Sequence, residues 1–142
     1  MRISTKGRYA LRLMLDLAEA EGGKPMSIKE ISKKENISDK YLEQIIAILN
    51  TAGFVRSIRG AQGGYVLKRL PGEYTVGMIL RLTEGSLAPV ACVEEETDCQ
   101  RMEICPTVKV WRRLNDAING VVDHITLADL VEWENDGSNY VI

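Results

Sequence analysis

The chain has 142 residues, the length of one domain or of one compact domain with an appended element. Apolar residues make up 45% and charged residues 27%, a composition that excludes a disordered chain. No apolar run approaches the ~18 residues that a membrane span requires, and the first residues lack the apolar core of a secretory signal. We therefore expect a cytoplasmic protein with no membrane association.

The net charge of −2 conceals two halves of opposite sign. Residues 1–70 carry 13 basic and 7 acidic side chains, whereas residues 71–142 carry 5 basic and 13 acidic ones. A basic half favours a polyanionic partner, because binding releases the counterions of that partner. The alternative is ordinary fluctuation of charge along the chain.

The first third of the chain predicts two helices. Apolar residues recur at helical spacing over residues 9–20. Ser27 and Glu30 have the spacing of a capping box, which predicts that a second, short helix begins at Ser27 and ends near Asn36.

A third helix and a hairpin follow. Ser38 is placed to cap the helix and Gly53 to end it. Its buried stripe is predicted to consist of four residues: Leu42, Ile45, Ile46 and Leu49. The strand-like segments 54–58 and 65–67 flank a glycine-rich turn and predict a β-hairpin. A helix, a helix-turn-helix and a hairpin, in this order, are typical of a winged helix.

The second half predicts a helix over residues 76–84, a loop without periodicity, a long helix from Pro106 and a short last helix over residues 126–134. The long helix would span about eighteen residues, roughly 27 Å. Its apolar stripe is predicted to contain Val108, Trp111, Ile118, Val121, Val122 and Ile125. Because so small a chain has little surface to cover this helix, we expect it to join two subunits of a homodimer; packing on its own domain is the alternative.

The predicted fold is therefore mostly α (α+β). A winged helix-turn-helix DNA-binding domain is expected over residues 1–70. A sensor loop and a dimerisation region with the long C-terminal helix are expected over residues 71–142.

The polar face of the third helix carries candidate DNA contacts, namely Ser38, Lys40, Tyr41, Glu43 and Gln44. Gln44 can pair with adenine and Glu43 can accept a hydrogen bond from cytosine N4. Ser38, Lys40 and Tyr41 can hold phosphates, with help from the backbone amides at the helix start. A solvated helix face has the same polarity and is the alternative for this helix taken alone.

The hairpin and the N-terminus favour the DNA interpretation. Arg59 lies beside Gly60 at the tip of the hairpin, where small residues permit close approach to a narrow minor groove that attracts Arg. Further phosphate contacts are expected from a basic N-terminal stretch: Arg2, Lys6, Arg8 and Arg12. Together these features predict double-stranded DNA as the partner.

Three cysteines, Cys92, Cys99 and Cys105, lie within fourteen residues at C-x6-C-x5-C spacing. Such density in a cytosolic protein indicates metal ligation or redox chemistry. The chain lacks the paired C-x-x-C knuckles of structural zinc sites, and a loop of irregular spacing suits an iron–sulfur cluster at least as well. Three incidental thiols are the alternative.

Four motifs resemble the IscR/CymR/NsrR family of winged-helix bacterial transcription regulators, in the same order and spacing. They are residues 1–10, Tyr41-Leu42-Glu43-Gln44, Arg59-Gly60-Ala61-Gln62-Gly63-Gly64-Tyr65, and Ile125-Thr126-Leu127-Ala128-Asp129-Leu130. The resemblance implies a homodimer that binds operator DNA, with a long crossing helix between the subunits. It also implies that Ser38, Tyr41, Glu43, Gln44 and Arg59 contact DNA, whereas Lys40 departs from the small polar residue of the IscR-like branch.

The cysteines resemble those of the IscR-like branch, in which three cysteines hold a [2Fe–2S] cluster. This implies a regulator that senses iron–sulfur status and controls genes for cluster assembly or related functions, with Cys92, Cys99 and Cys105 as metal ligands. The fourth ligand does not carry over, because Val108 and Arg8 stand at the two positions used in the family. His124 and the acidic residues near the cysteines are the alternatives.

A second interpretation keeps DNA binding and changes the signal. The ending Asn139-Tyr140-Val141-Ile142 resembles the tail of CymR-like regulators of cysteine metabolism, which are controlled through a complex with cysteine synthase. Thiol or zinc chemistry is also open. An enzyme is not expected, because the chain has one histidine and no evident nucleophile–base pair.

Overall fold

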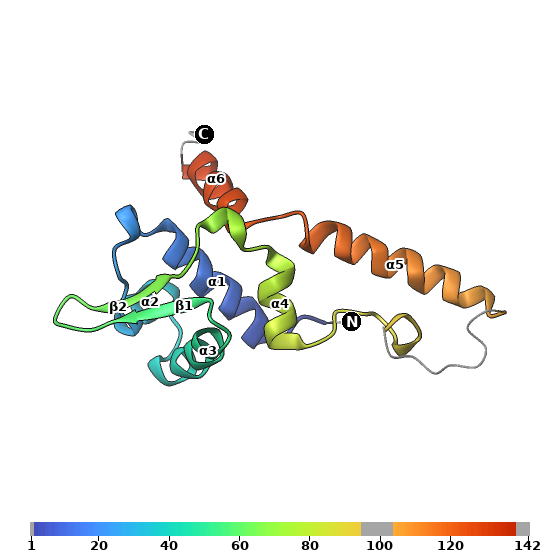
Figure 1. The fold of residues 1–142 in the computed structure, drawn as a ribbon, viewed down its shortest axis with the longest axis horizontal. Helices are drawn as coiled ribbons and strands as arrows, with labels where there is room; N and C mark the ends of the chain where they lie inside the picture. Colours follow the sequence, from blue (N-terminus) through green and yellow to red (C-terminus); the bar gives the residue numbers. More distant parts are fainter. Residues whose placement is uncertain (1, 95–103, 139–142) are drawn as a thin grey trace.

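The computed structural model describes residues 2–94 and 104–138. These residues form six α-helices and one two-stranded hairpin (Figure 1). In chain order the elements are α1 (Thr5–Glu19), η1 (Glu21–Gly23), α2 (Ile28–Glu35), α3 (Asp39–Thr51), β1 (Val55–Ile58), β2 (Gly64–Leu67), η2 (Pro71–Glu73), α4 (Val76–Glu84), η3 (Ala91–Val93), α5 (Pro106–Val122) and α6 (Leu127–Ser138). The predicted mostly α, winged helix-turn-helix fold is confirmed.

Local capping chemistry sets most helix ends. The hydroxyl of Ser27 accepts a hydrogen bond from the Glu30 amide at 3.2 Å, and α2 ends at Asn36 in the left-handed conformation, with a φ of 56°. The first helix begins earlier than predicted, because Ser4 caps it by accepting from the Gly7 amide at 3.1 Å. The apolar periodicity missed this first turn, which is mostly polar.

The main core joins the helix-turn-helix to elements from the second half of the chain. The four predicted residues of α3 are all buried. They share one cluster with residues of α1 and with Tyr74, Ile79 and Leu127. Helices α4 and α6 therefore pack on the first half of the chain, and the predicted domain boundary after residue 70 falls between elements that share a core.

Tyr74 ties the base of the hairpin to this core. Its side chain is fully buried, and its ring packs edge-on against Phe54 with centroids 5.6 Å apart. The hydroxyl donates to the Phe54 carbonyl oxygen at 2.7 Å and accepts from the Arg69 amide at 3.1 Å. One side chain thus satisfies a backbone carbonyl just before β1 and a backbone amide just after β2.

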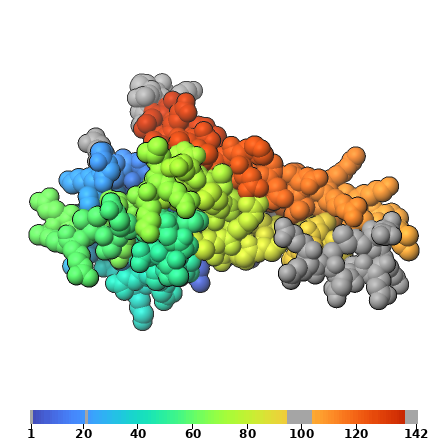
Figure 2. Space-filling model, in the orientation of Figure 1, coloured from blue at the N-terminus to red at the C-terminus, as the bar shows by residue number. Residues whose placement is uncertain are grey.

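Helix α5 extends away from the body formed by the other helices (Figures 1 and 2). Ile118 and Val122 of α5, and Ile125 just after it, belong to the predicted apolar stripe. They pack against a small apolar cluster on α4 and on the segment that follows α4. Arg81 of α4 holds the end of α5, donating to both carboxylate oxygens of Asp123 and to Asn119 Oδ1. The chain therefore covers one end of the helix.

The rest of α5 leaves apolar side chains in solvent. Val110 is 55% exposed, Leu114 40% and Val121 58%. Val108, by contrast, is buried near the start of the helix, where α5 contacts η3. Among the described residues, no helix combines the length and apolar character needed to cross a membrane.

The hairpin is fixed to the helix-turn-helix by a close backbone contact. Met26, just before α2, pairs with Tyr65 of β2 through two hydrogen bonds, with N···O distances of 3.1 and 2.8 Å. A Cβ on Gly64 would overlap the backbone of Met26. The strand can approach this closely only because position 64 is glycine.

We expect Gly64→Ala to separate β2 from Met26 and to lower the free energy of unfolding by about 1–3 kcal/mol, as overpacking does elsewhere. Urea unfolding measures the loss, and hydrogen exchange at the Tyr65 amide locates it. The matched control is Gly72→Ala, whose Cβ would meet only the Ala128 Cβ at 3.9 Å. Equal stability of the two variants would contradict the assignment.

Candidate nucleic-acid interface

The outer face of α3 presents the predicted polar residues. Ser38 caps the helix by accepting from the Tyr41 amide at 3.2 Å, so its hydroxyl is committed to the helix start. Lys40, Glu43 and Gln44 are exposed. They lie in the first two turns, the part of a recognition helix that enters the major groove. The structure thus places these three side chains together in solvent.

Tyr41 has a second contact that the sequence did not reveal. It is half-buried, and its ring packs edge-on against Tyr9 of α1, with centroids 5.8 Å apart and an interplanar angle of 88°. Tyr41 therefore helps to orient α3 against α1, besides lying near the candidate base contacts. Tyr9 stood inside the predicted first helix, but only the tertiary packing identifies its partner.

The hairpin presents Arg59 and Gly60 in solvent. Gly60 has a φ of 113° and open space around its Cβ position, so close approach of another molecule is unobstructed there. The Gly63 amide donates to the Gly60 carbonyl at 3.0 Å, and a Cβ on Gly63 would overlap the Ile58 carbonyl oxygen. The turn itself therefore requires Gly63, as the contact with Met26 requires Gly64.

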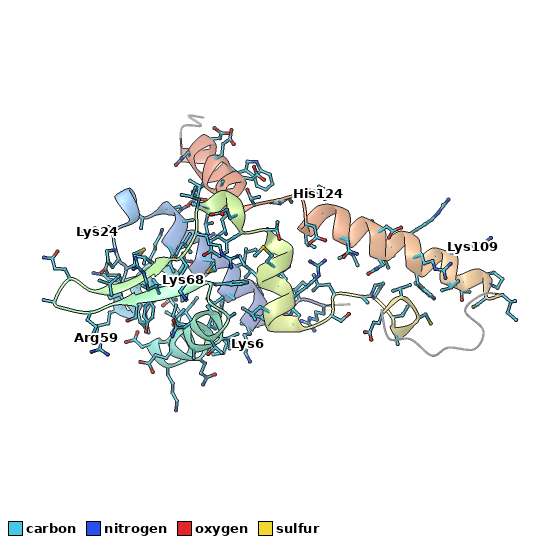
Figure 3. The ribbon with its side chains drawn as sticks, viewed as in Figure 1. Lys6, Lys24, Arg59, Lys68, Lys109 and His124 are labelled. Carbon is cyan, nitrogen blue, oxygen red and sulfur yellow. The ribbon has the colours of Figure 1, made fainter. Side chains whose placement is uncertain are left out.

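Further basic residues surround these elements. Arg56, Lys68 and Arg69 are exposed on and after the strands, although the sequence pattern pointed only to Arg59 on the hairpin. The alternation of side chains along β1 could have identified Arg56. In the view of Figure 3, Arg59 and Lys6 lie on either side of α3.

The N-terminal basic residues are not equivalent. Arg2 and Arg8 are exposed. Arg12 instead pairs with Glu35, with Nε and Oε2 2.7 Å apart, and this contact raises the pKa of Arg12 above its usual value. Arg12 therefore serves an intramolecular ion pair, and Arg2 and Arg8 are the better candidates for phosphate contacts.

The N-terminus is also tied to the second half of the chain. The backbone amide and the hydroxyl of Ser4 both donate to Glu84 Oε1 at the end of α4. A Cβ on Gly7 would overlap the same carboxylate. The candidate contact Arg2 thus lies two residues from a fixed junction between α1 and α4.

Two of the three cysteines lie in the described residues. Cys92 belongs to η3, and Cys105 immediately precedes α5, with its Sγ 3.0 Å from Thr107 Oγ1. Cys99 lies outside the described residues. Within residues 2–94 and 104–138, no three Cys, His, Asp or Glu side chains are grouped so that they could hold a metal ion. The described residues alone therefore do not provide the ligand set of the predicted cluster.

His124 does not fit as the fourth ligand within one chain. It follows the C-terminal end of α5, and its Nδ1 lies 3.0 Å from the Gly120 carbonyl oxygen. Cys105 precedes the N-terminal end of the same helix, and a helix of 17 residues is about 25 Å long. Figure 3 shows His124 and Lys109 near the two ends of α5.

Comparison with known proteins identifies related chains. Residues 3–133 match the model of the Rrf2 family, described as an iron-dependent transcriptional regulator. The HTH-type transcriptional regulator CymR of Bacillus subtilis is 44% identical over 133 residues, which are 94% of this chain and 91% of that protein. The HTH-type transcriptional regulator IscR of Serratia proteamaculans is 39% identical over 131 residues, 92% of this chain and 79% of that protein.

Solved structures show the same two groups of relatives. CymR (YrzC), the global cysteine regulator of B. subtilis, superposes with a TM-score of 0.80 at 43% identity, covering 94% of this chain and 98% of that one. IscR of T. potens gives a TM-score of 0.79 at 39% identity, covering 100% and 93%. The resemblance to the IscR/CymR/NsrR family is confirmed. The CymR-like alternative fits these similarities at least as well as the IscR-like interpretation.

Proposed function

Because this chain belongs to the Rrf2 family of transcriptional regulators, we propose that it binds double-stranded operator DNA as a homodimer and controls genes of cysteine metabolism. The exposed polar face of α3 beside the hairpin that bears Arg59 carries the DNA-binding part of the proposal. On this proposal, residues 1–70 supply the DNA contacts and residues 71–142 supply dimerisation and the response to a signal.

Each contact has a chemical role. Gln44 and Glu43 read base edges in the major groove, and Arg59 enters the adjacent minor groove beside Gly60. Arg2 and Lys40 neutralise phosphates. Ser38 and Tyr41 position the start of α3, and their hydroxyl groups contact the sugar–phosphate backbone of the DNA. The charged residues among them, Arg2, Lys40, Glu43 and Arg59, are all exposed, which supports these roles.

Similarity to CymR supports the choice of target genes. The similar B. subtilis protein is named a global cysteine regulator, and the overlap extends over nearly the whole of both chains. The predicted contact with cysteine synthase falls on residues 139–142, outside the described residues, and remains a prediction.

Exposed apolar residues on α5 support the homodimer. Val110, Leu114 and Val121 lie on a helix that projects from the body of its own chain (Figure 2). Burying such side chains against the same helix of a second copy removes apolar surface from water. A dimer would also place two copies of α3 on one DNA duplex, as a two-fold symmetric operator requires.

The DNA-binding proposal is tested with Arg59→Ala and Gln44→Ala. We expect each to weaken binding by about 5- to 150-fold, since a good base or minor-groove contact contributes roughly 1–3 kcal/mol. Fluorescence anisotropy measures the affinity on duplexes that the wild-type protein has selected from a randomised pool. The control is Lys109→Ala, which removes one cation from α5, far from Arg59 (Figure 3). If all three variants bind equally well, this interface is the wrong one.

The dimer is tested with Leu114→Glu on α5. A buried carboxylate facing its own copy is unfavourable, so we expect the variant to sediment as a monomer and to lose most of its operator affinity. Analytical ultracentrifugation of the wild-type protein and the variant gives the masses. The control is Leu70→Glu, at a leucine that is 73% exposed outside α5. A wild-type monomer, or a variant that stays dimeric, would contradict the proposal.

Iron–sulfur sensing is the second candidate signal. The three closely spaced cysteines and the family description as iron-dependent favour it. Cys92, Cys99 and Cys105 would be ligands of a [2Fe–2S] cluster, which would supply an oxidation-sensitive centre next to α5.

Iron–sulfur sensing is tested by a visible absorption spectrum, with iron and sulfide assays, of protein purified without air. A cluster predicts charge-transfer bands and about two irons per chain, lost in Cys92→Ser. His124→Asn is the control and should keep the colour, because His124 lies at the other end of α5 from Cys105. A colourless protein that resists anaerobic reconstitution would contradict iron–sulfur sensing and leave the proposed control of cysteine metabolism unaffected.

A further inference from the structure

A cluster of charged side chains with buried carboxylates lies between α1 and α2. Asp16 of α1 has only 2% of its side chain exposed, and its Oδ1 lies 2.9 Å from Lys34 Nζ. The same ammonium lies 3.2 Å from Glu19 Oε2. Glu35, with 8% of its side chain exposed, pairs with Arg12. Three carboxylates thus share two cations.

This cluster leaves carboxylate oxygens without partners. Asp16 Oδ2, Glu35 Oε1 and Glu19 Oε1 are buried and accept no hydrogen bond from any residue that the structure describes. Buried oxygens in this condition are costly. Asp16 and Glu35 belong to the same cluster, because Lys34 pairs with Asp16 while the next residue, Glu35, pairs with Arg12 one helical turn before Asp16, and each side chain affects the pKa of the other. Two ionised carboxylates have no hydrogen to donate, so a hydrogen bond between these side chains that would satisfy the buried oxygens requires a proton on one of them.

We propose that Asp16 and Glu35 share one proton, and that this carboxyl pair is a pH-sensitive link holding the helix-turn-helix against α1. The proton satisfies the contact between the two side chains. It also neutralises the cluster, because one proton, Arg12 and Lys34 together balance the three carboxylates. Removing the proton leaves two adjacent anions with little access to water, and they repel.

The surroundings favour a proton on Asp16. Burial, followed by the hydrogen bond with Glu35, raises the pKa of Asp16 to about 7, although Lys34 opposes the rise. Burial pushes the pKa of Glu35 upward as well, but hydrogen bonds with Asp16 and Arg12 outweigh it and leave that pKa below its usual value. From α6, Glu134 acts on Arg12 and so reaches the cluster indirectly.

The position of Glu35 connects the carboxyl pair to α3. Glu35 is the last residue of α2. The turn that follows is held by the left-handed Asn36 and by a hydrogen bond from Ser32 Oγ to the Ile37 carbonyl oxygen at 2.6 Å. Ser38 then caps α3. Repulsion between the carboxylates therefore acts on the start of the turn that orients the recognition helix.

The pH dependence has a definite sign. The folded protein binds the Asp16 proton more tightly than the unfolded chain, in which the pKa is near the ordinary 3.8. The stability from the shared proton is therefore complete below pH 4 and is lost as the pH rises from about 4 to about 7. In this range the unfolding constant should increase by up to about tenfold per pH unit, and the increase should cease above the pKa of Asp16.

The test replaces the proton by a permanent donor. In Glu35→Gln the amide can donate to Asp16 at every pH, and its oxygen can still accept from Arg12. We expect the variant to have a distinctly shallower slope than the wild-type protein, measured by urea unfolding at a series of pH values, because the contribution of Glu35 is removed while burial of Asp16 remains. Glu19→Gln is the matched control, since Glu19 shares Lys34 but is outside the carboxyl pair, and it should keep the wild-type slope.

A direct measurement locates the proton. The side-chain carboxyl carbon of Asp16, followed by NMR, should titrate near neutral pH in the wild-type protein and in Glu19→Gln, and at much lower pH in Glu35→Gln. Titration at the ordinary pKa of aspartate in the wild-type protein would overturn the proposal. So would a slope that is unchanged in Glu35→Gln, or one that disappears in Glu19→Gln.

The expected effect on DNA affinity rests on the proposed function and is measured in a separate experiment. Above neutral pH, we expect Glu35→Gln to bind selected duplexes several-fold more tightly than the wild-type protein, whereas the two should bind equally below pH 6. Equal affinities throughout, with the titration of Asp16 confirmed, would refute the link to α3. Absence of DNA binding in both proteins would refute the proposed function and leave the unfolding and NMR results intact.

Discussion

The position of α1 at the centre of the body is the constraint on which the other elements depend. Helices α2, α3, α4 and α6 all contact it. Five consecutive residues, Leu13 to Leu17, are buried, which an ordinary amphipathic surface helix does not show. A helix covered from several sides fixes the positions of its neighbours, because close-packed interiors resist small displacements.

Burial on every side also explains the least expected feature of α1. Asp16 falls among the five consecutive buried residues, so a carboxylate that would be exposed on an amphipathic helix is held in the interior. Lys34 from α2 compensates for this charge through an ion pair at 2.9 Å. A cluster of this kind adds little net stability over an apolar one, but it is sensitive to the loss of any single partner.

The sequence predicted the elements whose ends are set by local chemistry. Ser27 and Ser38 cap helices as expected, and Gly53 follows α3 with a positive φ of 77°. The last helix was predicted too short, ending at residue 134, because its final turns are polar and lack the apolar period. Apolar periodicity identifies the side of a helix that packs, and says little about polar turns at its ends.

The site was predictable to the extent that it depends on exposed polar residues in a recognisable order. Lys40, Glu43, Gln44 and Arg59 are all in solvent. The contact of Tyr41 with Tyr9, and the pairing of Arg12 with Glu35, join residues more than twenty positions apart. Nothing in the spacing of a single sequence specifies such pairs, because they depend on how the helices cross.

The fold of the body does not identify the signal to which the protein responds, since similar folds can respond to different signals. The segment that contains the cysteines lies between α4 and α5 in the chain. Helix α4 holds Ser4 at the start of α1 through Glu84, and it holds the end of α5 through Arg81 and Asp123. Cluster assembly, thiol chemistry or a bound partner would therefore act on the same junction between the body and the projecting helix. A change in this segment can therefore alter the placement of α5 relative to the body without altering the exposed residues of α3.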